Sequence, residues 1–314
     1  MARGQVEKKL SKQRIRILLG KKELENNRTI ALVDRFLMQK RGYVFRLPKP
    51  GKPVIFQLSG GIDSVTTIAM MMEDYGLAVY PVFLRRGQNR VKREEASVDY
   101  FNAYFLHRCP TLFHPVFKME TRIPPLEIRK VIIGHASEKI TKNSERRWGI
   151  PMYASLLTGY SVQYAYYLEE TTGMVIRTIL CAAVSADAIQ MAHHSLTGLR
   201  GILFDICSQT NDFRWQFTSP HIEPEMGRYA GKESIVRWGR EHDIPMHKTW
   251  SCYYKGLLHC GRCDGCGARK HAFTLARLSD QTVYENELSQ GTQWFFRAKK
   301  VLDDGLLELR KRIV

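Results

Sequence analysis

One junction, residues 59–64, constrains the fold of this chain more than any other feature. It reads Ser59, Gly60, Gly61, Ile62, Asp63, Ser64. Before it, residues 54–58 form a short apolar run rich in β-formers, which predicts a buried strand, and residues 64–75 after it have a helical pattern. A glycine turn between a strand and a helix is where an open α/β sheet holds its ligand.

The residue types of this junction indicate phosphate binding. Adjacent Gly60 and Gly61 let the backbone approach a phosphate closely. Their N–H groups, the hydroxyls of Ser59 and Ser64, and the positive end of the following helix can all face an anion. No lysine follows the glycines as in a Walker A loop, and the dinucleotide pattern G-x-G-x-x-G is absent, so another kind of nucleotide loop is predicted.

The pattern along the chain predicts an α/β fold, a parallel sheet with helices on both faces. Further strands are expected at residues 77–84 and 175–184, and helices at 93–106 and 156–168. Strands that alternate with helices favour a parallel sheet. A length of 314 residues suits about two domains.

A stretch punctuated by proline and glycine at residues 47–53 predicts a domain boundary near residue 52. The expected parts are a basic N-terminal extension at 1–52, a nucleotide-binding domain at 53–245, and a zinc-binding segment with C-terminal helices at 246–314. In the last part, Leu302, Leu306, Leu309 and Ile313 are spaced as one face of an amphipathic helix.

The charge of the chain favours a polyanionic ligand. The net charge is +17, and residues 1–50 alone hold 14 basic and 4 acidic residues. Such an excess attracts nucleotides, nucleic acid or an acidic protein face, or it serves only as a solubilising surface. No apolar run reaches the roughly 18–20 residues of a membrane helix, so we expect a soluble, cytoplasmic protein without membrane contact.

Four of the seven cysteines lie within fifteen residues and predict a metal site. Cys252, Cys260, Cys263 and Cys266 give C-x7-C-x2-C-x2-C, a set of thiolates that suits a structural tetrahedral Zn2+. An iron–sulfur cluster and a redox pair are the alternatives. The remaining cysteines are scattered and are expected to be small core residues.

The motif S-G-G-x-D-S after a strand resembles the PP-loop ATP pyrophosphatases. This resemblance implies an adenine nucleotide alpha hydrolase-like fold and cleavage of ATP between its α and β phosphates, with Mg2+ on the phosphates. The four-cysteine segment, residues 249–270, is similar to that of the 7-cyano-7-deazaguanine synthase family of queuosine biosynthesis. The resemblance covers roughly residues 53 to 280.

The resemblance also implies roles for individual residues. Phe83, Arg85 and Gln88 lie in a run like the one that follows the family's second strand, and they are expected to bind the nucleotide together with the loop residues Ser59, Gly60, Gly61, Asp63 and Ser64. Asp187 and Lys232 stand where the family keeps an aspartate and a lysine, and with Asp63 they are the expected catalytic residues. Asp187 and Lys232 each have an ordinary alternative role, as a strand-end cap and as a surface lysine respectively.

By resemblance, the reaction adenylates 7-carboxy-7-deazaguanine, and ammonia then displaces AMP to give an amide that a second adenylation converts to the nitrile. The implied ligands are ATP, a small deazapurine, Mg2+ and Zn2+, and the resemblance weakly implies a homodimer. Two alternatives are a relative that conjugates the deazaguanine to an amine of a protein or nucleic acid, as in antiviral defence operons, and a tRNA-modifying enzyme.

Two family segments are replaced in this chain. The V-P-G-R-N segment reads Ile150, Pro151, Met152, Tyr153, Ala154, and the G-Y-P-D-C run reads Met191, Ala192, His193, His194, Ser195. Both replacements favour a diverged member with its own substrate pocket or acceptor.

Overall fold

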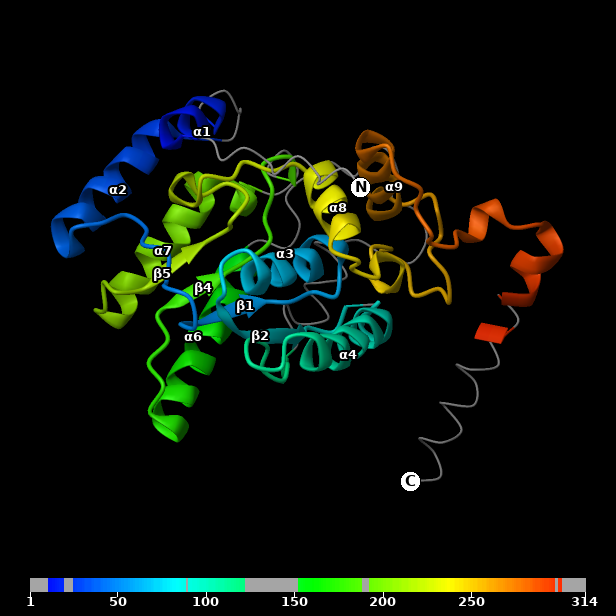
Figure 1. The fold of residues 1–314 in the computed structure, drawn as a ribbon, viewed down its shortest axis with the longest axis horizontal. Helices are drawn as coiled ribbons and strands as arrows, with labels where there is room; N and C mark the ends of the chain where they lie inside the picture. The colour runs from blue at the N-terminus through cyan, green and yellow to red at the C-terminus, as the bar shows by residue number, and fades with distance from the viewer. Residues whose placement is uncertain are drawn as a thin grey trace.

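The computed structural model describes residues 11–19, 25–88, 90–121, 152–187, 192–296 and 299–300. Its centre is a five-stranded sheet in the order β3-β2-β1-β4-β5, and every neighbouring pair is parallel (Figure 1). The strands are β1 (Pro53–Gln57), β2 (Ala78–Arg85), β3 (Phe117–Glu120), β4 (Thr178–Leu180) and β5 (Gln216–Thr218).

The helices connect and flank these strands. They are α1 (Lys12–Leu19), α2 (Asn27–Arg41), α3 (Ile62–Glu73), α4 (Val91–Arg108), α6 (Tyr153–Thr172), α7 (Leu196–Thr210), α8 (Lys232–Glu241) and α9 (Asp264–Ala276). Short 3-10 turns are η2 (Ala192–His194), η3 (Pro224–Met226), η4 (Met246–Lys248) and η5 (Glu285–Glu287).

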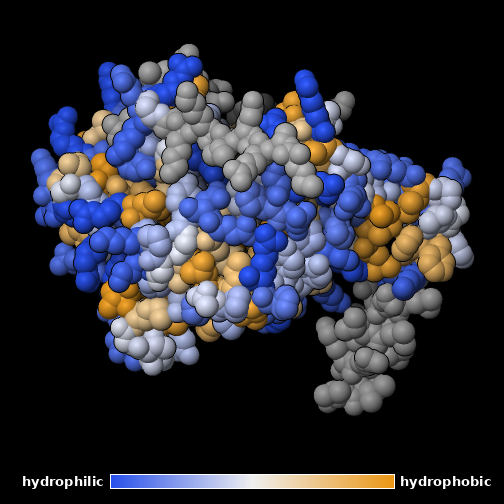
Figure 2. All heavy atoms as spheres, in the orientation of Figure 1, coloured by the Kyte–Doolittle hydropathy of each residue, from blue (hydrophilic) through white to orange (hydrophobic). Residues whose placement is uncertain are grey.

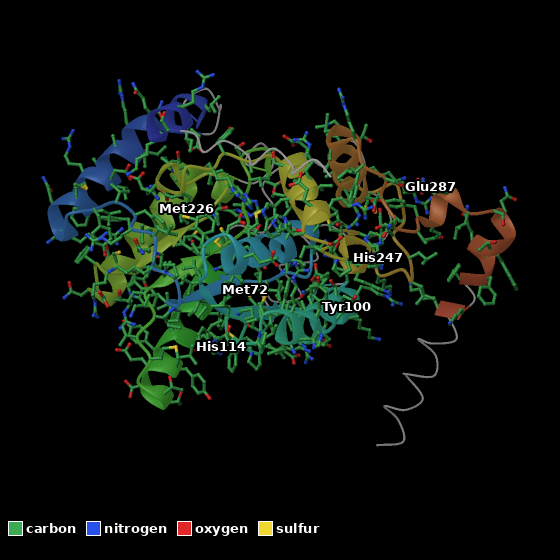
Figure 3. All side chains as sticks on the ribbon, in the orientation of Figure 1. Met72, Tyr100, His114, Met226, His247 and Glu287 are labelled. Carbon is green, nitrogen blue, oxygen red and sulfur yellow. The ribbon has the colours of Figure 1, made fainter. Side chains whose placement is uncertain are left out.

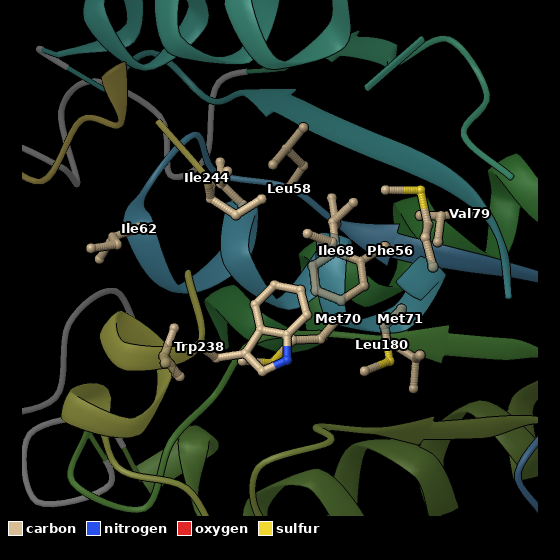
Figure 4. Close-up of a cluster of buried hydrophobic side chains, with 14 of the residues drawn as sticks. Phe56, Leu58, Ile62, Ile68, Met70, Met71, Val79, Leu180, Trp238 and Ile244 are labelled. Carbon is tan, nitrogen blue, oxygen red and sulfur yellow. The ribbon is translucent and has the colours of Figure 1, made fainter. Parts of the chain in front are cut away.

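The strands bury side chains on both faces, which creates two apolar layers. In β1, Val54 and Phe56 belong to the core under α3, α4 and α8, whereas Ile55 belongs to the core under α6 and α7. Successive side chains of a strand point to opposite faces, so a nearly continuous apolar strand fits a sheet covered on both sides. Figure 4 shows the first layer, in which Trp238 of α8 and Ile68 of α3 lie beside Phe56.

The predicted α/β class is confirmed, and the expected elements differ mainly in extent. The expected strands at 54–58 and 77–84 correspond to β1 and β2. The third, expected at 175–184, is confined to Thr178–Leu180, because β4 aligns with β1 only at Ile179 and Leu180 and Val175 is 50% exposed. The expected helices correspond to α3, α4 and α6.

Helix α2, in the expected N-terminal extension, packs on the sheet domain. Its buried residues Val33 and Leu37 belong to the same apolar layer as α7, and its Asp34 pairs with Arg200 of α7 at 2.7 Å. The division at residue 52 stays a prediction. The expected amphipathic face at Leu302–Ile313 lies outside the described residues, as do Ile150, Pro151 and Met191.

The face drawn in Figure 2 is mostly hydrophilic, with apolar residues in scattered patches. Among the helices that the structure describes, none has the length and apolar character to span a bilayer.

Candidate functional site

Residues 59–64, here called the phosphate loop, form a tight turn between β1 and α3. Ser59 and Ser64 close it, with their hydroxyl oxygens 2.9 Å apart. Gly60 adopts φ +76°, and a Cβ there would lie 2.7 Å from the carbonyl oxygen of Glu94. Only glycine combines this backbone conformation with so close an approach, which explains the first glycine of the motif.

The amino end of α3 opens from this loop. Gly61 is its N-cap and no side chain caps it, so the first N–H groups of the helix are left to other partners. A helix start of this kind, preceded by glycine backbone, is suited to an anion such as phosphate.

Lys232 lies between the two aspartates that the sequence singled out. Its Nζ is 3.0 Å from Oδ2 of Asp63 and 2.9 Å from Oδ1 of Asp187. Asp63 follows β1, Asp187 follows β4, and Lys232 is the first residue of α8. In the order β3-β2-β1-β4-β5, β1 and β4 flank the point where the strand order reverses, which is where such sheets bind ligands.

The charges of this cluster depend on one another. Burial lowers the pKa of Lys232, but the two carboxylates outweigh burial and raise it well above its usual value. Burial raises the pKa of Asp187, and Lys232 opposes that effect. The lysine is therefore held as a cation, and Oδ1 of Asp63 is buried without a hydrogen-bond partner among the described residues.

Two histidines of the site were not predicted as site residues. His194 Nδ1 lies 3.8 Å from Oδ2 of Asp187, and burial, followed by Lys232, lowers its pKa to about 4. His221 is fully buried with Nε2 2.7 Å from the hydroxyl of Thr67, which itself donates to the Asp63 carbonyl, and burial lowers the His221 pKa to about 3. Both imidazoles are neutral at pH 7.

Of the three residues expected in a run after the second strand, the structure places Phe83 and Arg85 in β2 itself and only Gln88 after it. Phe83 is 1% exposed within the core, and Arg85 pairs with Glu95 of α4. Gln88 Nε2 donates to the Glu94 carboxylate at 2.6 Å, so it lies near the residue whose backbone contacts Gly60. Their nucleotide-binding roles stay predictions.

The four predicted metal ligands converge. Cys252, Cys260, Cys263 and Cys266 are buried, and their sulfurs lie within 4.8 Å of one another. Sulfur–sulfur separations of 3.9 Å for Cys260–Cys266 and for Cys252–Cys263 match the roughly 3.8 Å edge of a tetrahedron with 2.3 Å metal–sulfur bonds. The spacing fits a single ion, and backbone N–H groups of Tyr254 and Cys260 donate to Cys252 Sγ at 3.4 Å.

Comparisons with known proteins match this part of the chain to one family. The family model "Queuosine biosynthesis protein QueC" matches residues 227–277, which include Lys232 and the four cysteines. The 7-cyano-7-deazaguanine synthase of Paracoccus denitrificans is 53% identical over 55 residues, 18% of this chain and 24% of the relative. That of Rhizobium meliloti is 49% identical over 115 residues, 34% of this chain and 48% of the relative.

The similarity is thus partial, since the chain covers less than half the length of these curated relatives. Among solved structures, the U34-tRNA thiolase NcsA from Methanococcus maripaludis with its [4Fe-4S] cluster aligns over 83% of this chain and 82% of that one, with 12% identity and a TM-score of 0.37. The chain is similar to 7-cyano-7-deazaguanine synthases over part of its length, and the matching family segment carries both the bridging lysine and the metal ligands.

Proposed function

We propose that this chain is an ATP-dependent C–N ligase that adenylates the carboxylate of a 7-carboxy-7-deazaguanine-like substrate. The observation that carries the proposal is Lys232 held between Asp63 and Asp187 beside the phosphate loop, at the reversal point of the sheet. Support also comes from the partial similarity to 7-cyano-7-deazaguanine synthases.

In the first step, a carboxylate oxygen of the substrate attacks the α phosphorus of ATP. The bond from the α phosphorus to the bridging oxygen breaks, and pyrophosphate leaves with that electron pair. The N–H groups of the phosphate loop and the start of α3 stabilise the charge on the departing pyrophosphate. Lys232 neutralises charge at the α phosphate, while Asp63 and Asp187 offer carboxylate oxygens of the kind that Mg2+ on the nucleotide prefers.

In the second step, a nitrogen nucleophile attacks the acyl carbon, and the bond to AMP breaks. The nucleophile must lose a proton as the amide forms. His194, next to Asp187, has a pKa of about 4 and does not hold a proton at pH 7, so this proton passes to solvent. With ammonia the product is an amide, and a second adenylation would allow loss of water to the nitrile.

The four cysteines would hold a Zn2+ ion, which would fix the fold of residues 252–266 and leave no open coordination position. This ion takes no part in the chemical steps.

A second candidate acceptor is an amine on a protein or nucleic acid. His193 and His194 stand where the family's substrate-contacting run differs, and the net charge of +17 suits a polyanionic partner. On this alternative the adenylate forms as above, but the acyl group passes to the larger amine.

The test is pyrophosphate release from ATP with 7-carboxy-7-deazaguanine, with and without ammonia, followed by mass spectrometry of products. Lys232→Met and Asp63→Ala should each lower kcat/KM at least about 100-fold, because each removes charge from the reacting centre. Lys52→Met, at an exposed lysine just before β1, is the matched control and should keep full activity. Substrate-dependent pyrophosphate release that gives no amide with ammonia would favour the larger acceptor, and undiminished turnover in Asp63→Ala would refute the assignment.

A further inference from the structure

Residues 249–266, here called the four-cysteine segment, lie directly against the phosphate loop. The backbone N–H of Trp250 donates to the carbonyl of Gly60 at 2.9 Å. The Ser97 hydroxyl of α4 donates to the same oxygen at 2.8 Å. One backbone oxygen of the loop is thus held by two other parts of the chain.

The hydrogen bond from Trp250 also sets the direction of the next N–H group in the loop. The C=O of Gly60 and the N–H of Gly61 belong to one planar peptide unit, so the direction of one sets the direction of the other. The Gly61 N–H makes a long hydrogen bond of 3.3 Å to the Ser59 hydroxyl oxygen, and it is among the loop donors that would turn to a phosphate. The four-cysteine segment therefore helps to aim a phosphate-binding N–H group.

The position of Trp250 depends in turn on the cysteine cluster. His259 Nε2 accepts the backbone N–H of Ser251 at 3.1 Å, and the His259 ring lies 4.3 Å from the Trp250 ring. His259 directly precedes Cys260, and Ser251 directly precedes Cys252. Four sulfurs this close together cannot all be ionised without a cation, and as neutral thiols no metal bond would tie them together, so the order of this stretch depends on a bound metal.

A second set of contacts presses the segment onto α4. Arg93 Nε donates to the carbonyl of Gly256 at 2.9 Å, and the Arg90 guanidinium lies 4.7 Å from the Tyr253 ring. Just before the segment, Lys248 Nζ lies 5.7 Å from the ring of Tyr100 on α4, and Figure 3 labels Tyr100 below His247 of η4. Helix α4 thus holds both the loop, through Ser97, and the segment.

We propose that the four-cysteine segment is a positioning element for the phosphate loop, with His259 as its positioning residue, so that metal binding and nucleotide binding are coupled. This inference rests on the proposed function, since it takes the loop to bind the phosphates of ATP. Coupling between two sites is reciprocal: the factor by which metal strengthens nucleotide binding is the factor by which nucleotide strengthens metal binding.

The experiment uses the full, zinc-loaded chain and the non-cleavable analogue α,β-methylene-ATP with Mg2+. Zinc transfer to a chromogenic chelator is followed with and without the analogue, and the analogue's Kd is measured by calorimetry for zinc-loaded and zinc-depleted protein. We expect the analogue to slow zinc release at least about fivefold, and zinc depletion to raise the Kd by a similar factor.

Three variants separate positioning from folding. His259→Leu keeps all four cysteines but loses the acceptor for Ser251, so the slowing of zinc release and the rise in Kd should both nearly disappear. His259→Gln restores an acceptor oxygen and should recover most of the coupling. His247→Leu, at an exposed histidine before the segment, should behave as wild type. If His259→Leu does not fold, Arg93→Ala, which cuts the link to Gly256, takes its place and should also lower both factors.

The outcomes distinguish the two proposals. If the analogue binds but does not slow zinc release, and its Kd is the same with and without zinc, the coupling is overturned and the proposed function stands. Failure of the zinc-loaded wild-type chain to bind the analogue overturns the proposed function and the coupling with it.

Discussion

At the residue scale, Gly60 of the phosphate loop tolerates little change. Its φ is +76°, and an added Cβ would meet the backbone of Glu94 at 2.7 Å. Gly60→Ala should therefore displace the phosphate loop, weaken ATP binding at least about tenfold, and cost about 1–3 kcal/mol of stability. Calorimetry with ATP and thermal unfolding measure the two effects.

Gly42 provides the control for this substitution. It has φ +77°, but nothing lies within 4 Å of an added Cβ. Gly42→Ala should thus lose stability through backbone strain alone and bind ATP as wild type does. Equal loss of ATP affinity in both variants would show that strain, not the contact with Glu94, explains the effect.

His221 makes the stability of the chain depend on acid pH. Its pKa is about 3 in the folded state against a usual 6.5, chiefly because of burial, so only the unfolded chain takes up the proton between those values. The free energy of unfolding should thus fall as pH falls through this window, by about 1.4 kcal/mol for each pH unit below 6.

Urea unfolding at several pH values tests this. His221→Gln, whose amide can still donate to Thr67, should remove that part of the slope, while His271→Gln at an exposed position should leave it intact. An unchanged slope in His221→Gln would contradict the prediction.

How far the site could be predicted differs from residue to residue. Asp63 was signalled by its loop, and Asp187 and Lys232 by resemblance, but no sequence pattern states that a lysine 169 residues from Asp63 will bridge both carboxylates. That contact results from the strand order. His221 has no local signal at all, because an isolated histidine in an irregular stretch is indistinguishable from a surface residue until its burial is known.

At the scale of elements, a buried ion-pair network ties α2 to the sheet domain. Arg200 of α7 is fully buried, with its guanidinium 2.8 Å from Glu223 and 2.7 Å from Asp34 of α2. Arg200→Met would leave the buried Glu223 carboxylate without its partner, and we expect a loss of about 3–5 kcal/mol in the free energy of unfolding.

Chemical denaturation measures this loss, and Arg214→Met is the matched control. Arg214 pairs with Asp212 at 2.7 Å but is largely exposed, so its loss should change stability by at most about 1 kcal/mol. Equal effects in the two variants would mean that burial does not set the strength of the Arg200 network.

The elements predicted from sequence were those with long or strongly apolar patterns. β1 and β2 are apolar runs and α3, α4 and α6 have clear helical spacing. β5 has only three residues, too few for a period to show, and β3 alternates between partly buried and exposed positions. Such short strands are defined by pairing with a neighbour, which local sequence does not encode.

At the scale of the whole molecule, the charge of +17 should cause salt-sensitive retention of RNA. We expect single-stranded RNA to bind without sequence preference and to lose at least about 100-fold in affinity between 50 and 200 mM salt, because released counterions drive the binding. Fluorescence anisotropy measures this. The double variant Arg28→Glu with Arg35→Glu, at two exposed positions of α2, should bind RNA more weakly than wild type at the same salt concentration. RNA affinity that does not change with salt would contradict a purely electrostatic role.

The central place of β1 in the sheet affects how readily this part of the molecule opens locally. It is hydrogen-bonded to β2 on one side and β4 on the other, whereas β3 and β5 each have a single neighbour. Edge strands can fray while a central strand opens only when the domain unfolds. We therefore expect the amides of β1 to be among the slowest of the sheet to exchange with solvent, and fraying of the edge strands should not move the turn that follows β1.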